Sequence, residues 1–580
     1  MRTPSVVARL PRLRALAAFA LTLTIGFVPA CGGDPNDPMT WAKQLKNLRT
    51  QKEALDHLAN MDVEKARPAV PALIELFQDT KRPEHLEALA RYLDPRTKPI
   101  LIEALEYTDD DFDRATIAAG ALGEMKDPEA VPPLIKAAEK ELPIKSRANN
   151  ARVAAMRALV KIGDKRAVPT LMKVLTTSAD EQDFALNQKA ALGLAEFRDP
   201  QAIPALIKGL FMTGRGTGIF QECRLALVRI GQPAVDPLIQ LLQEKNADIQ
   251  QMAQQLKFEE PPPVGTPGVV PHKAAILLGD LRAKKAVPAL AARLHMKARG
   301  DEHRSALIAL GYIATPQAVE AILADLKDAK ADPAERASAA DALYLSGDRR
   351  AVPTLLEVAK SGYVTSGGQK ASDLRASSAI ALARIAGKET YEPFKTLAEK
   401  ETAAQGVFGS ALDRLQVANE CDRDLNCYGK KLTDPSWERS EKAAFAIAFS
   451  GDSKKGLPLL LGAMKPITTM VPERYPVHQA ILFALARLGT KDCKDCIEKL
   501  DKQIERDEKA VRLPGARDLL GETRVTAAII MNKGAGDAAE PADAPAPSEQ
   551  AAPAPAAKGK PGKAKPAKPA KGGKGKKKHK

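Results

Sequence analysis

A phrase of roughly fifteen residues recurs along most of this chain, and it constrains the fold more than any other feature. Its clearest copies run from Ala121 to Ile135, from Ala158 to Met172 and from Gly193 to Ile207. Other copies begin at Ala226, Leu277, Ala309, Ala342 and Ala381, with more degenerate ones near Leu58, Ala88, Ala411, Ala446 and Ala484. Most copies lie about 30 to 40 residues apart, the spacing of helical-pair repeats, which predicts about thirteen stacked units.

Each part of the phrase predicts one piece of a helix-turn-helix. The first part has apolar residues at helical spacing and ends, in its clearest copy, at Gly163, which suits the left-handed stop after a helix. An Asp-Pro pair such as Asp127-Pro128 then predicts a turn with a side-chain acceptor. The second helix begins near a Pro whose missing N–H costs nothing there: Pro132, Pro169, Pro204, Pro288 and Pro353. We call the two helices A and B; neither buries its apolar stripe alone, so stacking must create the core.

The composition supports an all-α fold. Aromatic residues make up 4% of the chain while Ala and Leu dominate, which suits closely packed small helices. We therefore expect an α-solenoid, or superhelix, of stacked helix-turn-helix repeats over residues 54–533, with a last helix over 514–531. Two loops interrupt it, a Pro-rich extended loop at 257–271 and a Gly-rich inter-repeat loop from Phe211 to Phe220.

The phrase closely resembles the HEAT-like repeat first described in phycobilisome lyases, which has Ala-Leu-Gly at the end of helix A and Asp-Pro-x-Ala-Val-Pro-x-Leu entering helix B. The resemblance covers most of residues 54–500. It implies that helices B form a concave wall and that the protein serves as a protein-binding or assembly scaffold, since few members of the family are enzymes.

Three lysines line up on successive copies of helix B. Lys136, Lys173 and Lys208 each stand four residues after the repeat Pro position. They are either ordinary solvated side chains or a basic stripe that binds an acidic protein or an envelope polymer.

The N-terminal residues resemble a bacterial lipoprotein signal. Residues 1–30 have an Arg-bearing start and an apolar run of roughly 21 Å as a helix, shorter than the ~30 Å core of a bilayer. Val28-Pro29-Ala30-Cys31 resembles a lipobox, so we expect a signal peptide over residues 1–30 and lipidation of Cys31, with residues 31–53 forming a tether and a first helix. The alternative is a plain cleaved signal peptide without a lipid. Gly32 after that Cys favours an exported, outer-membrane lipoprotein, periplasmic or surface-exposed.

The positive charge of the chain belongs to its ends. The net charge is +15, of which Arg2, Arg9, Arg12 and Arg14 supply four and the eleven Lys of residues 558–580 supply eleven. The body is therefore balanced and carries no global footprint for nucleic acid. The tail, residues 534–580, is Ala/Pro/Lys-rich and predicts a disordered segment. Outside the cytoplasm it would bind anionic lipid or cell-wall polymer, or serve only to keep the protein soluble.

Four of the six cysteines form two close pairs. Cys421 and Cys427 form one, Cys493 and Cys496 the other, both near the junction of helix A with helix B. In an oxidising periplasm we expect two disulfides. A shared zinc site is the alternative, but the pairs are two repeats, roughly 20 Å, apart. We expect Cys223 to be a buried core thiol.

No catalytic constellation stands out. One HEAT-repeat enzyme, deoxyhypusine hydroxylase, holds a di-iron site with repeated His-Glu pairs, whereas this chain has seven His and no His-Glu dipeptide. We therefore expect no metal, no cofactor and no enzyme activity. The sequence favours a non-enzymatic scaffold of the bacterial cell envelope that binds another envelope protein on its concave face and reaches the membrane through a lipid anchor. The alternatives are a HEAT-fold lyase or oxidoreductase related to phycobilin lyases or deoxyhypusine hydroxylase, and a binder of anionic polymer or nucleic acid through the tail.

Overall fold

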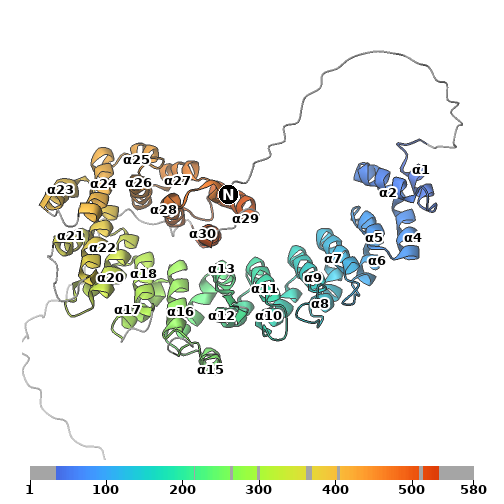
Figure 1. The fold of residues 1–580 in the computed structure, drawn as a ribbon, viewed down its shortest axis with the longest axis horizontal. Coiled ribbons are helices and arrows are strands. Elements are labelled where there is room, and N and C mark those ends of the chain that lie inside the picture. Colours follow the sequence, from blue (N-terminus) through green and yellow to red (C-terminus); the bar gives the residue numbers. More distant parts are fainter. Residues whose placement is uncertain are drawn as a thin grey trace, which may run out of the picture. The chain divides into compact units, whose positions relative to one another are not determined.

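The computed structural model describes most of the chain between residues 34 and 534. The exceptions within that range are 215, 261–264, 297–300, 361–368, 401–404 and 509–513. The described chain is predominantly helical and divides into two compact units, residues 1–281 (unit 1) and 282–580 (unit 2) (Figure 1). Cys31, the predicted signal segment and the predicted tail beyond residue 534 lie outside the described residues.

Unit 1 contains six helix pairs: α2 with α4, α5 with α6, α7 with α8, α9 with α10, α11 with α12, and α13 with α14. Its helices are α1 (Pro38–Gln44), α2 (Gln51–Asn60), α3 (Val63–Ala66), α4 (Val70–Thr80), α5 (Pro83–Ala90), α6 (Lys98–Glu103), α7 (Asp113–Met125), α8 (Val131–Ala138), α9 (Asn149–Ile162), α10 (Val168–Thr176), α11 (Phe184–Phe197), α12 (Ile203–Gly209), α13 (Phe220–Ile230), α14 (Val235–Leu242), α15 (Ala247–Leu256) and α16 (Val269–Asp280).

Unit 2 contains six more pairs: α18 with α19, α20 with α21, α22 with α23, α24 with α25, α26 with α27, and α28 with α29. Its helices are α17 (Val287–Leu294), α18 (Glu302–Ile313), α19 (Pro316–Lys327), α20 (Pro333–Ser346), α21 (Val352–Lys360), α22 (Gln369–Ile385), α23 (Tyr391–Lys400), α24 (Gln405–Cys421), α25 (Leu425–Lys431), α26 (Trp437–Phe449), α27 (Ser453–Ala463), α28 (Tyr475–Leu488), α29 (Lys494–Glu508) and α30 (Pro514–Asn532). With the copy carried by α16 and α17, the total agrees with the predicted thirteen, and α30 confirms the predicted last helix.

The segment between the two helices of a pair, the A–B turn, is built as the sequence predicts. In the pair of α7 and α8, the Asp127 carboxylate accepts a hydrogen bond of 2.9 Å from Glu129 N. A single 3-10 turn follows, and α8 then begins one residue before Pro132. The same Asp contact, to the amide two residues on, recurs at Asp94, Asp164, Asp199 and Asp348. Where this Asp is present, it fixes how helix B leaves its helix A.

The left-handed stop after helix A is also present, but glycine is not always its residue. Gly163 has φ 76° at the end of α9, as expected. Lys126 and Arg198 occupy the same place after α7 and α11, with φ 53° and 51°. The turn thus keeps its geometry where the sequence has no glycine. A residue with a Cβ is less stable than glycine in this left-handed conformation, so these turns carry a cost in free energy.

Helices A pack against one another through small residues. Gly123 of α7 lies so near α9 that a Cβ built on it would be 2.8 Å from Ala158 Cα. Contact between successive helices A continues through α11 and α13. In Figure 1, α7, α9, α11 and α13 lie on one side of unit 1 and α8, α10 and α12 on the other. Small side chains allow short spacing between helix axes, so the row of helices A is the closely packed one.

The two predicted loops differ from expectation in detail. The Gly-rich segment forms a small antiparallel hairpin, in which β1 (Thr213–Gly214) pairs with β2 (Thr217–Gly218). The Pro-rich loop ends earlier than predicted, because α16 starts at Val269 and includes Pro271 in its first turn, where proline is tolerated. The Glu259 carboxylate accepts hydrogen bonds from Gly268 N and Val270 N, 2.6 and 2.7 Å, and so secures the start of α16. The helix before the loop, α15, was not predicted.

Unit 2 turns so tightly that its helices A meet across its interior. Tyr312 of α18 lies 6.1 Å from Phe483 of α28, and Tyr344 of α20 lies 5.3 Å from Phe445 of α26, measured between ring centroids. Arginines cover the rings: Arg282 over Tyr312, Arg384 over Tyr344 and Arg487 over Phe449. We call these eight side chains the aromatic–arginine cluster: Tyr312, Tyr344, Phe445, Phe449, Phe483, Arg282, Arg384 and Arg487.

The cluster corrects the expectation that helices B form the concave wall. In unit 2 helices A form the inner row and helices B the outer one (Figure 1). The physical reason is the small size of the A-row residues, such as Ala339, Ala340 and Ala342, all fully buried. A row of helices with shorter spacing must lie on the inside of a bend.

Two searches of the described residues bear on the sequence predictions. None of the helices is both long enough and apolar enough to cross a bilayer. Within the same residues, no three His, Cys, Asp or Glu side chains gather as a set of metal ligands.

Two glycines of α7 test the packing of the A row. Gly123→Ala should lower the free energy of unfolding by about 1–3 kcal/mol, because the added methyl group meets the backbone of α9. Gly120, three residues earlier and exposed, has nothing within 4 Å of a built Cβ. Gly120→Ala should raise stability by about 0.5–1 kcal/mol through helix propensity. Urea unfolding of both variants measures this, and equal effects would contradict the close approach.

The burial of His478 predicts that the stability of unit 2 falls at acid pH. It is 2% exposed, neither ring nitrogen has a hydrogen-bond partner, and burial lowers its pKa from 6.5 to about 4 despite the opposing pull of Asp507. The unfolded chain therefore binds the proton first as pH falls, so the stability is complete above pH 6.5 and declines towards pH 4 by about 3 kcal/mol. His478→Leu should remove this decline in thermal unfolding between pH 7 and 4. The exposed His295→Gln variant is the control and should keep it.

Candidate functional site

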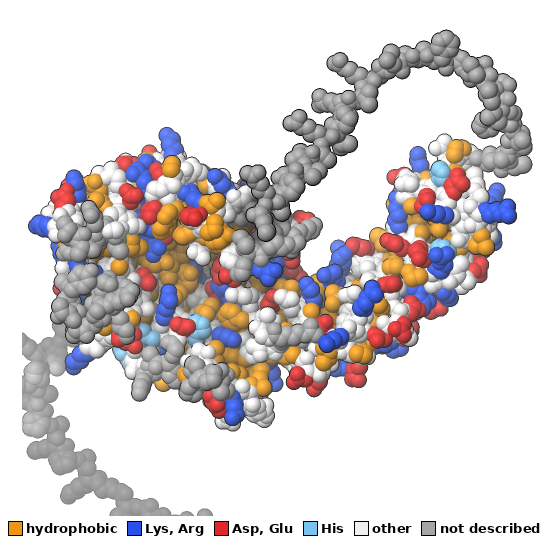
Figure 2. Space-filling model, viewed as in Figure 1, with side chains coloured by type: hydrophobic (Ala, Val, Ile, Leu, Met, Phe, Trp, Pro, Cys, Tyr) orange, Lys and Arg blue, Asp and Glu red, His pale blue; other side chains and the backbone are white. Residues whose placement is uncertain are grey.

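The three lysines of the predicted stripe lie on the helices B of successive pairs in unit 1, where Lys136 and Lys173 are exposed and Lys208 is half-buried. Each has a carboxylate partner: Lys136 with Glu106 at 2.6 Å, Lys173 with Glu139 at 2.9 Å, and Lys208 with Asp248 at 3.2 Å. Figure 2 shows both signs of charge interspersed over the visible face of unit 1. The positive charge of the three lysines is therefore compensated locally, and a role in binding remains a prediction.

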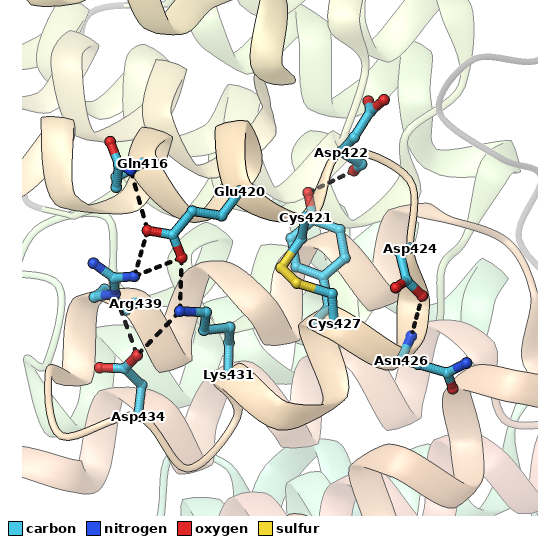
Figure 3. Close-up of a disulfide and its surroundings, with 11 residues drawn as sticks. Gln416, Glu420, Cys421, Asp422, Asp424, Asn426, Cys427, Lys431, Asp434 and Arg439 are labelled. Atoms are coloured by element: carbon cyan, nitrogen blue, oxygen red, sulfur yellow. Dashed lines mark hydrogen bonds and ion pairs between the residues drawn. A yellow bond between two sulfur atoms is a disulfide. The ribbon is translucent and has the colours of Figure 1, made fainter.

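The four predicted disulfide cysteines are paired in the structure, both times at an A–B turn of unit 2. Cys421, the last residue of α24, is joined to Cys427 of α25, with Cα atoms 5.4 Å apart (Figure 3). Cys493, directly before α29, is joined to Cys496 at a Cα distance of 5.3 Å. Cys223 is free and buried, as a core thiol would be, and burial raises its pKa.

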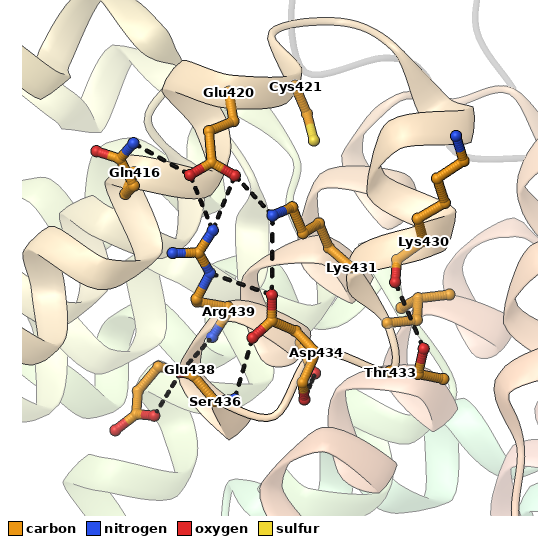
Figure 4. Close-up of polar contacts among 12 residues, drawn as sticks. Gln416, Glu420, Cys421, Lys430, Lys431, Thr433, Asp434, Ser436, Glu438 and Arg439 are labelled. Atoms are coloured by element: carbon orange, nitrogen blue, oxygen red, sulfur yellow. Dashed lines mark hydrogen bonds and ion pairs between the residues drawn. The ribbon is translucent and has the colours of Figure 1, made fainter.

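Beside the first disulfide, four charged side chains tie α24, α25 and α26 together (Figure 4). Glu420 accepts two hydrogen bonds from Arg439, at 2.9 and 2.8 Å, and pairs with Lys431 at 2.6 Å. Arg439 also pairs with Asp434 at 3.2 Å. The hydrogen bond from Lys431 is the largest cause that lowers the pKa of Glu420 to about 2. This network and the disulfide together hold the A–B turn after α24 in place.

The tight turn of unit 2 gathers the A–B turns of four successive helix pairs around one pocket of about 350 Å³. We call it the turn pocket. The first two turns contribute Arg349, after α20, and the residues from Arg384 to Ala386, at the end of α22. The third contributes the disulfide-closed segment from Asp422 to Tyr428, after α24. The pair of α26 and α27 contributes Lys442, Ser450, Asp452 and Lys455. The lining residues are spread over more than a hundred positions of the sequence, from Arg349 to Lys455, and the curvature of the unit brings them together.

Lys442 is the most unusual group in this pocket. It is 2% exposed, and its ammonium donates to Arg384 O and Ala386 O at 3.0 and 2.6 Å. Burial, the largest cause, and the nearby charge of Arg349 lower its pKa from 10.5 to about 7. Near neutral pH this amine therefore exists in both protonation states.

The three carboxylates of the turn pocket already serve local purposes. Asp424 caps α25 by accepting from Asn426 N at 2.9 Å, and Asp452 caps α27 by accepting from Lys455 N at 3.0 Å. Asp422 forms an ion pair with Lys388. The pocket also holds Arg349, Arg384, Arg423, Lys442 and Lys455. Cations thus outnumber acids in the lining of the pocket.

A buried carboxylate between two guanidinium groups supports the inner wall. Glu441 pairs with Arg384 and with Arg414, each at 2.6 Å, and its side chain is 3% exposed. Arg414 is 1% exposed and stacks against the Trp437 ring at 4.9 Å. Arg384 keeps its Nε buried and without a hydrogen-bond partner among the described residues. Two guanidinium groups therefore share the Glu441 carboxylate in this wall.

A second cavity lies beside the other disulfide. Its volume is about 510 Å³, and its wall is mostly apolar: Leu457, Pro458, Leu461 and Leu488, with Ser453, Lys454, Thr490, Cys493 and Asp495 at its edge. The N-terminal part of α27 contributes to both cavities, since Asp452 and Lys455 line the turn pocket and Ser453 and Lys454 line this one.

Sequence reasoning identified the cysteines beside the turn pocket but not the pocket itself. Lys442 and Glu441 stand in helix A of a degenerate copy. Arg384 and Arg414 occupy a position of helix A that other copies fill with Lys161, Arg229 and Arg487, so their residue type does not distinguish them. The pocket arises from contacts between pairs that are far apart in the sequence, and no local pattern marks it.

Two family models match parts of the sequence. A model described as HEAT repeats matches residues 115–183 and 142–211, and one described as PBS lyase HEAT-like repeat matches residues 335–361. These matches fall on α7 to α12 and on α20 with α21, where the structure has its stacked pairs. The chain therefore contains HEAT repeats. No curated protein matches the chain.

Solved structures share parts of this helical arrangement. The complex of CpcE and CpcF of phycocyanin lyase from Nostoc is 26% identical, covers 50% of this chain and 95% of that one, and has a TM-score of 0.23. Kap121p is 13% identical with coverages of 85% and 53% and a TM-score of 0.41, so the chain spans about half its length. Human deoxyhypusine hydroxylase is 19% identical, with coverages of 52% and 98% and a TM-score of 0.19. These partial likenesses assign neither activity nor partner.

The wall of the turn pocket makes a stability prediction. Glu441→Gln keeps the shape of the side chain but removes the carboxylate that Arg384 and Arg414 share. The free energy of unfolding of unit 2 should fall by about 3–5 kcal/mol. Glu473→Gln, at an exposed turn of the same unit, should change it by less than about 0.5 kcal/mol. Hydrogen exchange of α22, α24 and α26 distinguishes the two variants, and unchanged protection in Glu441→Gln would contradict the proposed balance of charges.

Proposed function

We propose that this HEAT-repeat protein is a non-enzymatic, protein-binding scaffold of the bacterial cell envelope, held at a membrane by a lipid on Cys31. The observation that carries the proposal is the state of the cysteines: the four that form close pairs lie at A–B turns in disulfides, and the fifth is buried. Disulfides of this kind persist in an oxidising compartment such as the periplasm. The lipobox-like Val28-Pro29-Ala30-Cys31 fits the same location.

The partner we propose is another envelope protein, bound along the row of helices B in unit 1. Stacked repeats present long, continuous surfaces that single domains lack. The row in unit 1 carries exposed lysines that alternate with acidic partners, so a partner with its own acidic side chains can exchange for the intramolecular ones at little cost. The inner row of unit 2, by contrast, is filled by the aromatic–arginine cluster.

Cross-linking in native membranes, read by mass spectrometry, tests location and partner together. The wild-type chain should fractionate with membranes, incorporate labelled fatty acid and cross-link to one envelope protein. Cys31→Ser should lose the label and leave the membrane fraction, whereas Cys223→Ser should do neither. Persistent membrane association of Cys31→Ser without label would contradict the anchor.

The binding surface has its own pair of variants. Replacing Lys136, Lys173 and Lys208 together by Glu places like charges beside Glu106, Glu139 and Asp248 and should strongly reduce the cross-linked partner. The matched control replaces three exposed lysines of α29 by Glu: Lys494, Lys499 and Lys502. An equal yield from both triple variants would exclude the proposed surface.

A further inference from the structure

The turn pocket has the size and charge of a ligand site that the scaffold function does not need. Its volume of about 350 Å³ falls within the range of small-molecule pockets. Its surroundings are rigid, because the Cys421–Cys427 disulfide closes the segment that forms one wall and the Glu420 network fixes that segment to α26. A site of this build can hold a small molecule without a large change of shape.

The charges of the pocket select the sign of such a ligand. Five cations line the pocket against three carboxylates, so its formal charge is positive. Asp424 and Asp452 also cap α25 and α27, and Asp422 pairs with Lys388. Lys455, which lines the pocket, has a side chain that is 72% exposed and only a 3.9 Å contact with Asp452. Arg384, in the same wall, keeps a buried Nε without a partner among the described residues. An incoming anion would find cationic donors at more than one side of the cavity.

We propose that the turn pocket of unit 2 binds a small anion of the phosphate or carboxylate class, with Lys442 at its inner wall and Arg423 and Lys455 at its rim. Lys442 comes from α26, Arg423 from the A–B turn after α24 and Lys455 from α27, so the ligand would be held by two neighbouring helix pairs. The site does not depend on the lipid anchor or on the protein partner.

Lys442 makes the site sensitive to pH. Its ammonium faces the carbonyl oxygens of Arg384 and Ala386 at the end of α22. The charges around it are Arg349 after α20, Arg414 of α24 and Glu389 before α23, besides its own neighbour Glu441. Burial holds its pKa near 7, and a bound anion favours the protonated amine. Affinity should therefore rise as pH falls through 7 and decline by about tenfold per pH unit above it.

Isothermal titration of the purified full-length protein with inorganic phosphate, sulfate and citrate tests the site. Sulfate does not titrate between pH 6 and 9, so its pH profile reports the protein alone. Binding of phosphate and sulfate but not citrate would assign a phosphate-class ligand, and the reverse a carboxylate. Failure of all three anions to bind would overturn the proposal.

Two adjacent lysines give a matched pair of variants that should both fold. Lys455→Ala should weaken anion binding by about threefold, because an exposed charge is lost from the rim. Lys454→Ala removes an equally exposed charge that lines the neighbouring cavity and should leave affinity unchanged. Equal effects of the two would show that only the general charge of the surface attracts the anion, and would overturn the site.

Lys442→Met tests the inner wall. The variant should bind sulfate about tenfold or more weakly at pH 6 and lose the decline of affinity above pH 7. Thermal unfolding shows whether unit 2 of this variant is folded. If it is not, the pH profile is measured with Lys455→Ala, which keeps Lys442 and should retain the profile of the wild type. A wild-type affinity for sulfate that does not change between pH 6 and 9 would contradict the assignment of Lys442.

Discussion

The close approach of helices A is the constraint on which the rest of the structure depends. Ala and Gly at their contacts let neighbouring backbones come together, as at Gly123 against Ala158. Helices B, which carry larger Leu, Ile and Val, do not pack as closely along their row. A stack with one short row must bend towards it. In unit 2 the bend is strong enough for α18 and α20 to reach α28 and α26.

Bending brings with it a problem of buried charge. Once helices A of distant pairs face each other, the arginines among them leave water, and each needs a partner. Arg384 solves this with the faces of Tyr344 and Phe445 and with Glu441, which it shares with Arg414. Such an arrangement contributes less to stability than an apolar core of equal volume, but removing one member is costly. The buried charges therefore define which helices may meet, and they leave Lys442 at the edge of a cavity.

The local parts of this architecture could be predicted because each is specified within a few residues. Asp127 caps its own turn, Pro132 fits the first turn of its own helix and Gly163 ends its own helix. The disulfide pairs could be predicted for the same reason, since Cys421 and Cys427 are six residues apart. The turn pocket could not, because Arg349 and Lys455 are brought together by the sum of small rotations over four helix pairs. A phrase that repeats indicates stacking, but the curvature depends on side-chain sizes in contacts between repeats. The choice of helix row on the inside was mistaken for that reason.

Both disulfides lie in unit 2, the strongly bent unit. Each closes the A–B turn of a pair in the strongly bent unit, and each borders a cavity. Asp424 caps the turn after α24, as Asp127 and Asp164 cap turns of unit 1. Beside the turn pocket, however, the segment from Asp422 to Asn426 has solvent on one side and would otherwise be free to move. A covalent link restricts the conformations of such a segment without filling the space beside it. The position of the disulfides thus follows from the need to keep a cavity open in a fold whose stability rests on close packing.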